Sequence, residues 1–465
     1  MEQILCKKKE LENIVNNLLK DYSRTSLIQG YDMNSRLLRK AIITKYLKLI
    51  VPDQNKENKT VCLNKYGEIN LLDYFDQKIK IGSKSKYGDV YTIKCKINKK
   101  LSFNIAVKLI PLSYKDRIHM YNTKFFAWRE LRTLNLLNNL AKRRVCPNIT
   151  MIYNWYICNN CKYQNINLKP LNSKMCILAL IELADTDLRN WIIKKSKQKK
   201  IDYNISDQWY NIFFQIFVPI YTIYREYQIV HHDLHWGNVL ITYIDSGGYW
   251  IYEIEGIKFY IPNLGLFIQI CDFGKCQSKT QFVIRDDDIL ENKDINCIQN
   301  FDKDKSFSPN TDVVKITNIH NWVKSAFMIE NKKIIPNDII TLLENIRLDS
   351  KVNTLKLIKA HFSKYLNNKI GKKIYKSDLK FLDRKPIKNI SFLKIGDIVS
   401  YSKTGKYVLV NKFKSNMVSI IISIGFKMRK INVPLKDINK FSIDIEPDKS
   451  IHTYLKGDPI DIYRI

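Results

Sequence analysis

Hydrophobic positions along this chain recur with helical spacing in some segments and with the alternation of a strand in others. Residues 1–52 carry two apolar stripes at helical spacing, and Pro52 ends the second. From about residue 70 the pattern becomes that of several strands around one helix. The predicted strands cover 78–82, 90–96, 103–110, 149–157 and 175–183, and the predicted helix covers 123–140. We therefore expect a helical N-terminal extension over 1–70 and an antiparallel sheet with one helix over 71–183.

The remaining pattern is mainly helical up to about residue 370 and strand-like after it. Helical spacing covers 206–227, 312–330, 336–347 and 353–367, and Pro219 predicts a kink in the first of these helices. Residues 371–390 form a basic linker with poor periodicity. Short alternating runs between turns then fill 391–445, which predicts a small β-barrel of the SH3-like class, and 446–465 is a tail.

The charge of the chain narrows the choice of partner. Lys and Arg number 77 and Asp and Glu 45, so the formal net charge is +32. This excess favours an acidic partner, such as nucleic acid or an acidic protein, although lysines spread for solubility would give the same count. No run of about 18 uncharged apolar residues and no signal-peptide pattern occur, so we expect an intracellular protein without a membrane partner.

The ten cysteines follow no framework spacing. Reduced thiols in an intracellular protein are therefore the first interpretation. Cys158 and Cys161 form one CxxC pair, and Cys146 or Cys176 could extend it toward the four ligands of a structural zinc site. A zinc knuckle between two strands is the alternative to reduced thiols.

Two short polar segments carry the strongest chemical signal. Residues 231–240 read His-His-Asp-Leu-His-Trp-Gly-Asn-Val-Leu, and residues 272–274 read Asp-Phe-Gly behind an apolar run. Phosphoryl transfer needs a carboxylate that accepts a hydroxyl proton and oxygen ligands that hold Mg²⁺ against the phosphates of ATP. Asp233 is suited to the first role, and Asn238 and Asp272 are suited to the second.

A lysine near the middle of the predicted sheet adds a phosphate-binding group. Lys108 ends the strand-like run Ile-Ala-Val-Lys at 105–108. A buried ammonium is costly unless it meets an anion, and the α- and β-phosphates of ATP together with a helix carboxylate would meet that need. Glu130 lies in the next predicted helix and is the candidate partner; the alternative is an exposed carboxylate on that helix.

The turn before this strand is a candidate loop over the phosphates. Gly82 and Gly88 are its glycines, and Ser83 and Ser85 stand where a G-x-G-x-x-G pattern counted back from Gly88 has the other two. Backbone amides can still cover phosphates there, with less conformational freedom.

Together these motifs resemble a eukaryotic-type protein kinase from about residue 76 to 370. The catalytic-loop segment is closest to that of haspin-like kinases, which include kinases of large DNA viruses. Between Asn238 and Asp272 lies an insertion over 242–268 that reads as a β-hairpin, a feature typical of the group. The resemblance implies an α+β, bilobal protein-kinase fold with a C-lobe over 184–370. It also implies ATP and Mg²⁺ as cofactors, transfer of the γ-phosphate to serine or threonine of a protein, and a viral origin, in the host cytoplasm or the virion.

The same resemblance assigns a role to each candidate. Asp233 orients and deprotonates the hydroxyl, Lys108 held by Glu130 positions the phosphates, and His235 stands where ordinary serine/threonine kinases have a lysine on the γ-phosphate. Glu182 falls at the interlobe hinge, whose backbone binds adenine. The expected nucleotide-binding set is Gly82, Ser83, Ser85, Gly88, Val90, Ala106, Lys108 and Glu182, and the expected metal ligands are Asn238 and Asp272.

Two further features depart from ordinary kinases. His232 replaces the usual arginine, which implies an enzyme that is not switched on by phosphorylation of its activation loop. No Ala-Pro-Glu follows the Asp-Phe-Gly segment. Asp312 either steadies the backbone of the catalytic loop or simply caps a helix.

Two other functions remain open. Aminoglycoside and choline kinases use a similar H-x-D-L-H-x-x-N loop, so a small-molecule phosphotransferase is one alternative. The other is a pseudokinase scaffold that binds nucleic acid or virion proteins through its basic surface. The predicted barrel, where lysines alternate with aromatic residues, would contribute to that surface.

Overall fold

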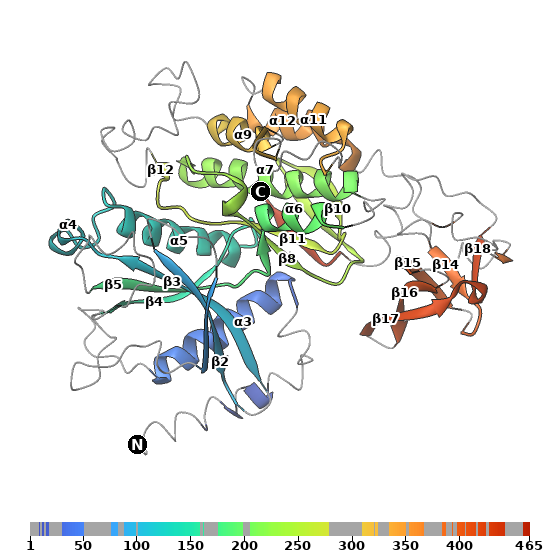
Figure 1. Cartoon of the computed structure of the whole chain (residues 1–465), viewed down its shortest axis with the longest axis horizontal. Coiled ribbons are helices and arrows are strands. Elements are labelled where there is room, and N and C mark those ends of the chain that lie inside the picture. Colours follow the sequence, from blue (N-terminus) through green and yellow to red (C-terminus); the bar gives the residue numbers. More distant parts are fainter. Residues whose placement is uncertain are drawn as a thin grey trace. The chain divides into compact units, whose positions relative to one another are not determined.

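The computed structural model is a mixed α/β protein with several sheets (Figure 1). It describes residues 9, 12–13, 15–17, 30–50, 76–81, 88–98, 101–158, 161, 175–198, 205–278, 309–319, 321–323, 334–349, 353–366, 384–386, 393, 398–404, 406–414, 417–424, 427–441 and 459–465. The chain divides into two compact units. The first comprises Met1–Ile192, Val218–Thr242 and Ile268–Asn321, and the second comprises Ile193–Phe217, Tyr243–Phe267 and Trp322–Ile465.

A five-stranded antiparallel sheet is the frame of the first unit. Its strands are β1 (Asp76–Ile81), β2 (Asp89–Lys96), β3 (Ser102–Pro111), β4 (Ile152–Cys158) and β5 (Cys176–Ile181), in the order β1-β2-β3-β5-β4. Strand β3 lies in the middle and is buried almost throughout, which explains its nearly continuous apolar sequence. The strands predicted from alternation are confirmed.

Helices cover both faces of this sheet. They are α3 (Met33–Ile50) and α5 (Phe126–Lys142), and the short α4 (Tyr114–Ile118) precedes α5. Ile42, Ile43 and Leu47 of α3 share a core with Val107 and alternate residues of β3. Because side chains alternate along a strand, Lys108 points to the opposite face, where α5 lies (Figure 1). The helix predicted over 123–140 is confirmed.

The rest of the first unit consists mainly of short elements. They include β6 (Thr186–Asp187), β7 (Ile229–Val230), the 3₁₀ turn η3 (Trp236–Asn238), β12 (Gln277–Ser278) and α9 (Asn310–Thr317). The boundaries between the two units fall inside four elements of the chain. These are α6 (Leu188–Ser196), α7 (Ile205–Tyr227), β8 (Val239–Tyr243) and β11 (Leu266–Ile270). Helix α7 continues through Pro219.

The predicted hairpin lies in the second unit. Strands β9 (Tyr249–Ile254) and β10 (Ile257–Pro262) pair antiparallel across a two-residue turn. Glu255 and Gly256 both have positive φ, 48° and 74°, as a tight hairpin turn of this length requires. The tail contributes a strand that the sequence did not indicate: β19 (Asp461–Arg464) pairs parallel to β9.

Aromatic rings form much of the core around that hairpin. Phe214 of α7 contacts Tyr252, Phe259, Phe362 and Tyr365 at ring-centroid distances between 5.4 and 5.5 Å. Helices α11 (Asn337–Leu348) and α12 (Thr354–His361) and the turn η6 (Ser363–Tyr365) complete this part of the unit. No helix among the described residues is both long and apolar enough to span a bilayer.

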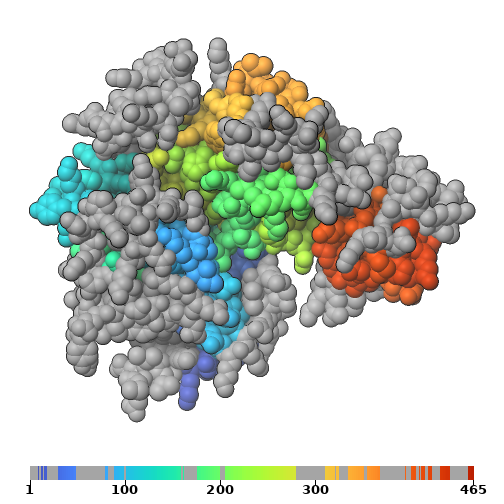
Figure 2. All heavy atoms as spheres, viewed as in Figure 1, coloured from blue at the N-terminus to red at the C-terminus, as the bar shows by residue number. Residues whose placement is uncertain are grey.

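The C-terminal strands form a six-stranded sheet. They are β13 (Arg384–Pro386), β14 (Ile398–Tyr401), β15 (Lys406–Lys414), β16 (Met417–Ile424), β17 (Lys427–Pro434) and β18 (Ile438–Phe441), with the turn η10 (Leu435–Asp437) before β18. Figure 2 shows their side chains, orange to red, as one block. The order β13-β18-β14-β15-β16-β17 leaves β13 and β17 as edges, so the described strands form an open sheet and the predicted SH3-like barrel is not supported.

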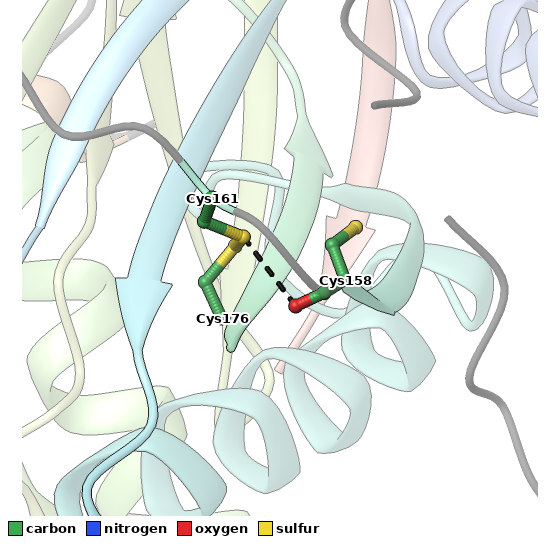
Figure 3. The surroundings of a disulfide bond; sticks show 3 residues. All are labelled: Cys158, Cys161 and Cys176. Atoms are coloured by element: carbon green, nitrogen blue, oxygen red, sulfur yellow. Dashed lines mark hydrogen bonds between the residues drawn. A yellow bond between two sulfur atoms is a disulfide. The ribbon is translucent and has the colours of Figure 1, made fainter. Parts of the chain in front are cut away.

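A disulfide corrects the expectation of reduced thiols for one pair of cysteines, whereas Cys95, Cys146, Cys271 and Cys276 are free thiols. Cys161 is bonded to Cys176, the first residue of β5, and its Sγ also lies 3.4 Å from the carbonyl oxygen of Cys158 (Figure 3). These two sulfurs are therefore not zinc ligands. Within the described part of the chain, no group of three or more His, Cys, Asp or Glu residues is arranged to hold a metal ion.

Candidate active site

One ammonium and two carboxylates meet in the first unit. Lys108 Nζ lies 2.6 Å from Oε1 of Glu130 and 2.9 Å from Oδ1 of Asp272. Lys108 and Glu130 are buried, whereas 28% of the Asp272 side chain is exposed. The second oxygen of Glu130, Oε2, is buried and has no hydrogen-bond partner among the residues that the structure describes. We call these three residues the lysine triad.

The lysine triad has more negative than positive charge. Burial acts to lower the pKa of Lys108, but Asp272 and Glu130 outweigh it and hold that pKa above its usual value. Burial, opposed by Lys108 and reinforced by Asp272, raises the pKa of Glu130 to about 7. Burial also acts to raise the pKa of Asp272, and Lys108 more than offsets it, so this pKa is lowered. The lysine triad can therefore accept a further cation on its exposed side.

The Asp-Phe-Gly segment is fixed by contacts of α5. Asp272 has a φ of 65°, a conformation that is uncommon outside glycine. A Cβ on Gly274 would lie only 2.0 Å from the ring of Phe126, so a larger residue there would require that ring to move. Arg129 donates from its guanidinium to the carbonyl oxygen of Gly274 at 3.2 Å. Helix α5 thus places both Glu130 and the segment that carries Asp272.

Asp312 of α9 holds the backbone of the loop that carries Asp233. Its two carboxylate oxygens accept the N–H groups of His231 at 2.7 Å and of His232 at 2.8 Å. Asp312 is only 2% exposed, and the φ of His232 is 60°. Of the two roles considered for Asp312, the structure therefore shows the one that steadies the loop.

The side chain of Asp233 lies between two lysines. Lys275 Nζ is 3.1 Å from its Oδ2, and Lys315 Nζ is 3.4 Å from its Oδ1. Lys315 also donates to the carbonyl oxygen of His232 at 3.1 Å. Sequence reasoning did not identify either lysine as part of the site. Lys275 directly follows the Asp-Phe-Gly segment, and Lys315 lies one helical turn after Asp312. These two positions in the sequence could have pointed to the lysines as neighbours of the site.

The catalytic loop is tied directly to the Asp272 segment. The N–H of Cys271 donates to the carbonyl oxygen of Asn238 at 3.0 Å. The side-chain amide of Asn238 donates to the carbonyl oxygen of Asp233 at 2.8 Å, which leaves its oxygen as the acceptor end. Carboxylate and amide oxygens suit Mg²⁺, which usually keeps several waters and phosphate ligands of its own. The excess negative charge and the unpartnered Glu130 oxygen also fit a divalent cation.

His235 is oriented by a local hydrogen bond. Its Nδ1 accepts the N–H of Gly237 at 3.0 Å, so in the neutral ring the proton is on Nε2. Burial lowers the pKa of His235 below its usual value, with Asp233 opposing the shift. The ring is therefore mostly uncharged near pH 7.

The predicted phosphate-covering turn is only partly described. Gly82, Ser83 and Ser85 lie outside the described residues. A Cβ on Gly88 would approach the carbonyl oxygen of Leu109 to 2.3 Å, so this position requires glycine. Val90 pairs with Lys108, and Ala106 pairs with Ile181.

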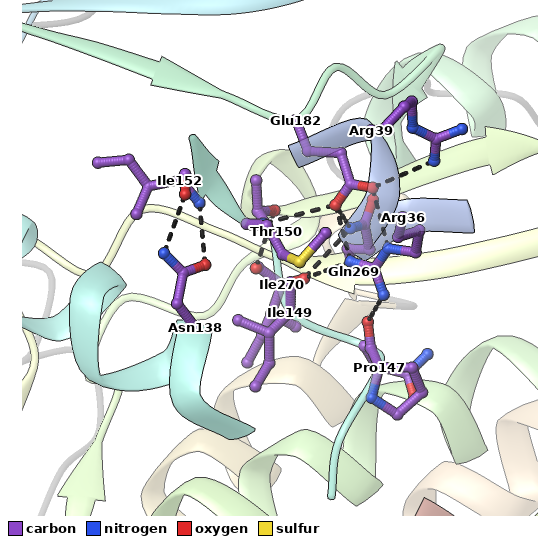
Figure 4. Close-up of polar contacts among 12 residues, drawn as sticks. Arg36, Arg39, Asn138, Pro147, Ile149, Thr150, Ile152, Glu182, Gln269 and Ile270 are labelled. Atoms are coloured by element: carbon purple, nitrogen blue, oxygen red, sulfur yellow. Dashed lines mark hydrogen bonds and ion pairs between the residues drawn. The ribbon is translucent and has the colours of Figure 1, made fainter. Parts of the chain in front are cut away.

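Glu182 occupies a saturated ion cluster. Arg36 of α3 donates to its two oxygens at 2.9 and 2.7 Å, and Gln269 donates to Oε2 at 2.7 Å (Figure 4). Arg39 lies 3.7 Å from Oε1. Burial acts to raise the pKa of Glu182, but the two arginines and Gln269 together hold it below its usual value.

The other donors of Arg36 are engaged as well. We call Glu182, Arg36, Arg39 and Gln269 the arginine cluster. Arg36 donates to the carbonyl oxygens of Pro147 at 2.6 Å and Ile149 at 2.9 Å (Figure 4). The N–H of Glu182 donates to the carbonyl oxygen of Met151 at 2.8 Å, so that N–H is not available to adenine. Arg36 could not be recognised as a partner of Glu182 from the sequence, because it lies 146 positions away in the N-terminal extension.

No family model matches the chain. Over 255 residues it is 25% identical to a probable serine/threonine-protein kinase of Invertebrate iridescent virus 6, covering 54% of this chain and 45% of that protein. It is 28% identical over 350 residues to an uncharacterized protein of Acanthamoeba polyphaga mimivirus, covering 58% of this chain and 46% of that protein. A third relative, an uncharacterized protein of Invertebrate iridescent virus 3, is 24% identical over 144 residues, covering 30% of this chain and 18% of that protein. The chain thus spans less than half the length of these viral relatives, and one of them is a probable kinase.

Proposed function

We propose that this chain is an ATP- and Mg²⁺-dependent serine/threonine protein kinase with a bilobal protein-kinase fold. The lysine triad carries the proposal: one buried ammonium meets two carboxylates, one of them partly exposed, beside a loop that holds Asp233 and Asn238. Phosphoryl transfer needs this combination of a phosphate-binding cation, metal-binding oxygens and a nearby carboxylate base.

Each residue has one task in the transfer. Lys108, held by Glu130, binds the α- and β-phosphates of ATP, while Asn238 and Asp272 would hold Mg²⁺, which neutralises phosphate charge when bound. Asp233 accepts the proton of the substrate hydroxyl. The hydroxyl oxygen bonds to the γ-phosphorus as the bond from that phosphorus to the bridging oxygen breaks, and ADP leaves with the electron pair.

The acceptor and the source are parts of the same proposal. The probable serine/threonine kinase among the relatives and the haspin-like catalytic loop support a hydroxyl of serine or threonine as the acceptor. The viral relatives support a viral protein that acts inside the host cell, on structural proteins of the virus or the host. A net charge of +32 supports acidic acceptor proteins, with nucleic acid as an additional partner.

Labelled phosphate transfer tests the proposal. Wild type and Asp233→Asn are incubated with ATP, Mg²⁺ and casein, histone or no added protein, and label on serine, threonine and tyrosine is separated. We expect label on serine or threonine and a loss of about 10²–10⁴-fold in the variant. Label only on small-molecule acceptors would instead assign a small-molecule phosphotransferase. ATP-dependent thermal stabilisation without any transfer would assign a pseudokinase scaffold.

A further inference from the structure

Helix α9 holds the catalytic loop with one negatively charged and one positively charged side chain. Asp312 and Lys315 are three positions apart, so they lie on the same face of the helix. Asp312 accepts the N–H groups of residues 231 and 232, whereas Lys315 donates to the carbonyl oxygen of residue 232 at 3.1 Å. The ammonium then lies 3.4 Å from Oδ1 of Asp233. Only 16% of the Lys315 side chain is exposed, so it is held in this position.

The position of this lysine matters because the loop that carries Asp233 supplies no permanent positive charge. His235 accepts the N–H of Gly237 through Nδ1, and its burial favours the neutral ring. His231 accepts the N–H of Asp233 through Nδ1 at 3.2 Å, and its Nε2 lies 2.9 Å from the carbonyl oxygen of Cys271, as the neutral Nε2–H tautomer requires. The ammonium groups beside Asp233 in the described part of the chain are therefore those of Lys275 and Lys315.

The two lysines are held differently. Lys275 follows the Asp-Phe-Gly segment and reaches Oδ2 of Asp233 at 3.1 Å. Lys315 comes from a helix that also anchors the loop backbone, and it bridges a backbone carbonyl and the carboxylate of adjacent residues. It therefore restrains the rotation of the Asp233 side chain relative to the loop.

We propose that Lys315 is a positioning residue for Asp233, and that its ammonium supplies from α9 the fixed positive charge that the catalytic loop lacks. The inference rests on the proposed kinase function. The role of Lys315 is electrostatic as well as structural: its charge keeps Oδ1 of Asp233 in place and so fixes the orientation of the carboxylate that accepts the proton of the substrate hydroxyl.

Three substitutions separate charge from hydrogen bonding. Lys315→Met removes both, Lys315→Gln keeps a donor for the carbonyl of His232 without charge, and Lys315→Arg keeps both. Lys364→Met is the matched control, because Lys364 also pairs with an aspartate, Asp207, at 3.1 Å in the second unit. For each variant we would measure kcat, KM for ATP and the shift in melting temperature on adding ATP and Mg²⁺.

We expect kcat to fall about 10–100-fold in Lys315→Met and Lys315→Gln, with KM for ATP changed less than twofold. Lys315→Arg should retain most of the activity, and Lys364→Met should match wild type. In an Asp233→Asn background, Lys315→Met should have no further effect on the residual rate, because its target is already lost.

The outcomes separate this proposal from the kinase proposal. An active wild type with an equally active Lys315→Met or Lys315→Gln would overturn the role of Lys315 and leave the kinase function standing. Loss of the ATP-induced shift together with activity would assign Lys315 to folding alone, and also overturn it. A wild type that transfers no phosphate to any acceptor would overturn both proposals.

Discussion

The first unit contains two buried ion clusters that differ in the sign of their excess charge and in whether both oxygens of the buried glutamate are hydrogen-bonded. In the arginine cluster, the carboxylate of Glu182 meets Arg36, Arg39 and Gln269, and the remaining donors of Arg36 bind backbone carbonyls. In the lysine triad, one ammonium serves two carboxylates, and one oxygen of Glu130 has no hydrogen-bond partner in the described residues.

The difference shows which cluster stabilises the fold and which is suited to a ligand. A buried carboxylate is tolerated when both of its oxygens accept hydrogen bonds from charged or polar donors, so Glu182 can fix α3 against the sheet without any further group. The lysine triad has an excess of negative charge and one partly exposed carboxylate, so it gains most from an added cation and its phosphates. Breaking the first should affect unfolding, whereas breaking the second should affect transfer.

The largest effect is expected from Arg36→Met. It would leave Glu182 buried beside only Arg39, at 3.7 Å, and would remove the bonds to two carbonyl oxygens. Losing one partner of a buried ion pair costs about 3–5 kcal/mol, so the free energy of unfolding in urea should fall by that amount. The double variant Arg36→Met/Glu182→Met is the control and should regain part of the loss. An unchanged unfolding curve for Arg36→Met would contradict the structural role of the cluster.

The next effect is expected from Asp272→Asn, and it should appear in activity. Lys108 keeps Glu130 at 2.6 Å, so the free energy of unfolding without nucleotide should change by less than about 1 kcal/mol. The rate of phosphate transfer should fall by about 10²–10³-fold, about 3–4 kcal/mol in the activation barrier. Steady-state kinetics and urea unfolding of the same preparation test both parts. A large loss of stability would show that the lysine triad, like the arginine cluster, stabilises the fold.

His232 is buried as well, but unlike the two ion clusters it is a base that the fold keeps uncharged. Burial lowers the pKa of His232 to about 4, against the opposing effect of Asp312. The unfolded chain therefore takes up a proton below about pH 6.5, whereas the folded chain does so only near pH 4. Stability from this group is present above pH 6.5 and is lost as the pH falls toward 4, by about 3 kcal/mol in total.

His232→Gln separates this histidine from the carboxylates that also titrate in acid. Urea unfolding of wild type and variant at pH 7 and pH 4.5 gives the measurement. The wild type should lose about 2–3 kcal/mol more than the variant between the two pH values. Equal losses in both proteins would show that His232 is not held neutral.

The sequence predicted the elements and motifs more fully than it predicted their neighbours. Period-two runs located β3 and β5, helical spacing located α5, and a two-residue turn located the β9–β10 hairpin, because each depends on local contacts. The structure brings Lys108, Glu130 and Asp272 together as the kinase-like spacing implies. Their roles in catalysis remain predictions.

Contacts between segments that are distant in the sequence could not be predicted from local patterns. Arg36 meets Glu182 across 146 positions and Lys315 reaches Asp233 across 82, and neither arginine nor lysine is unusual on a helix of a basic protein. The pairing of β19 with β9 joins the tail to an internal hairpin. The short runs after residue 391 predicted strands correctly, but alternation alone does not determine whether a sheet closes into a barrel.

The last contrast comes from making the same substitution in both clusters, and the smallest effect is expected in the lysine triad. Glu182→Gln leaves two arginines buried around an uncharged group, so it should destabilise the protein by several kcal/mol, close to the loss in Arg36→Met. Glu130→Gln should change the free energy of unfolding by less than about 1 kcal/mol at pH 7, because a pKa raised to about 7 leaves the ionised carboxylate little net stabilisation to lose, and Asp272 still pairs with Lys108 at 2.9 Å.

The raised pKa of Glu130, about 7, also predicts that Glu130→Gln has little effect on stability at neutral pH. A carboxyl group with a raised pKa stabilises the fold most below its unfolded value near 4.5, and that contribution is lost as the pH rises toward 7. A neutral glutamine avoids the loss at pH 7, so Glu130→Gln should tolerate neutral pH better than Glu182→Gln. Urea unfolding of the two variants at pH 5 and pH 7.5 measures the contrast. Equal destabilisation at both sites would mean that the lysine triad, like the arginine cluster, is a complete structural ion cluster rather than a ligand site.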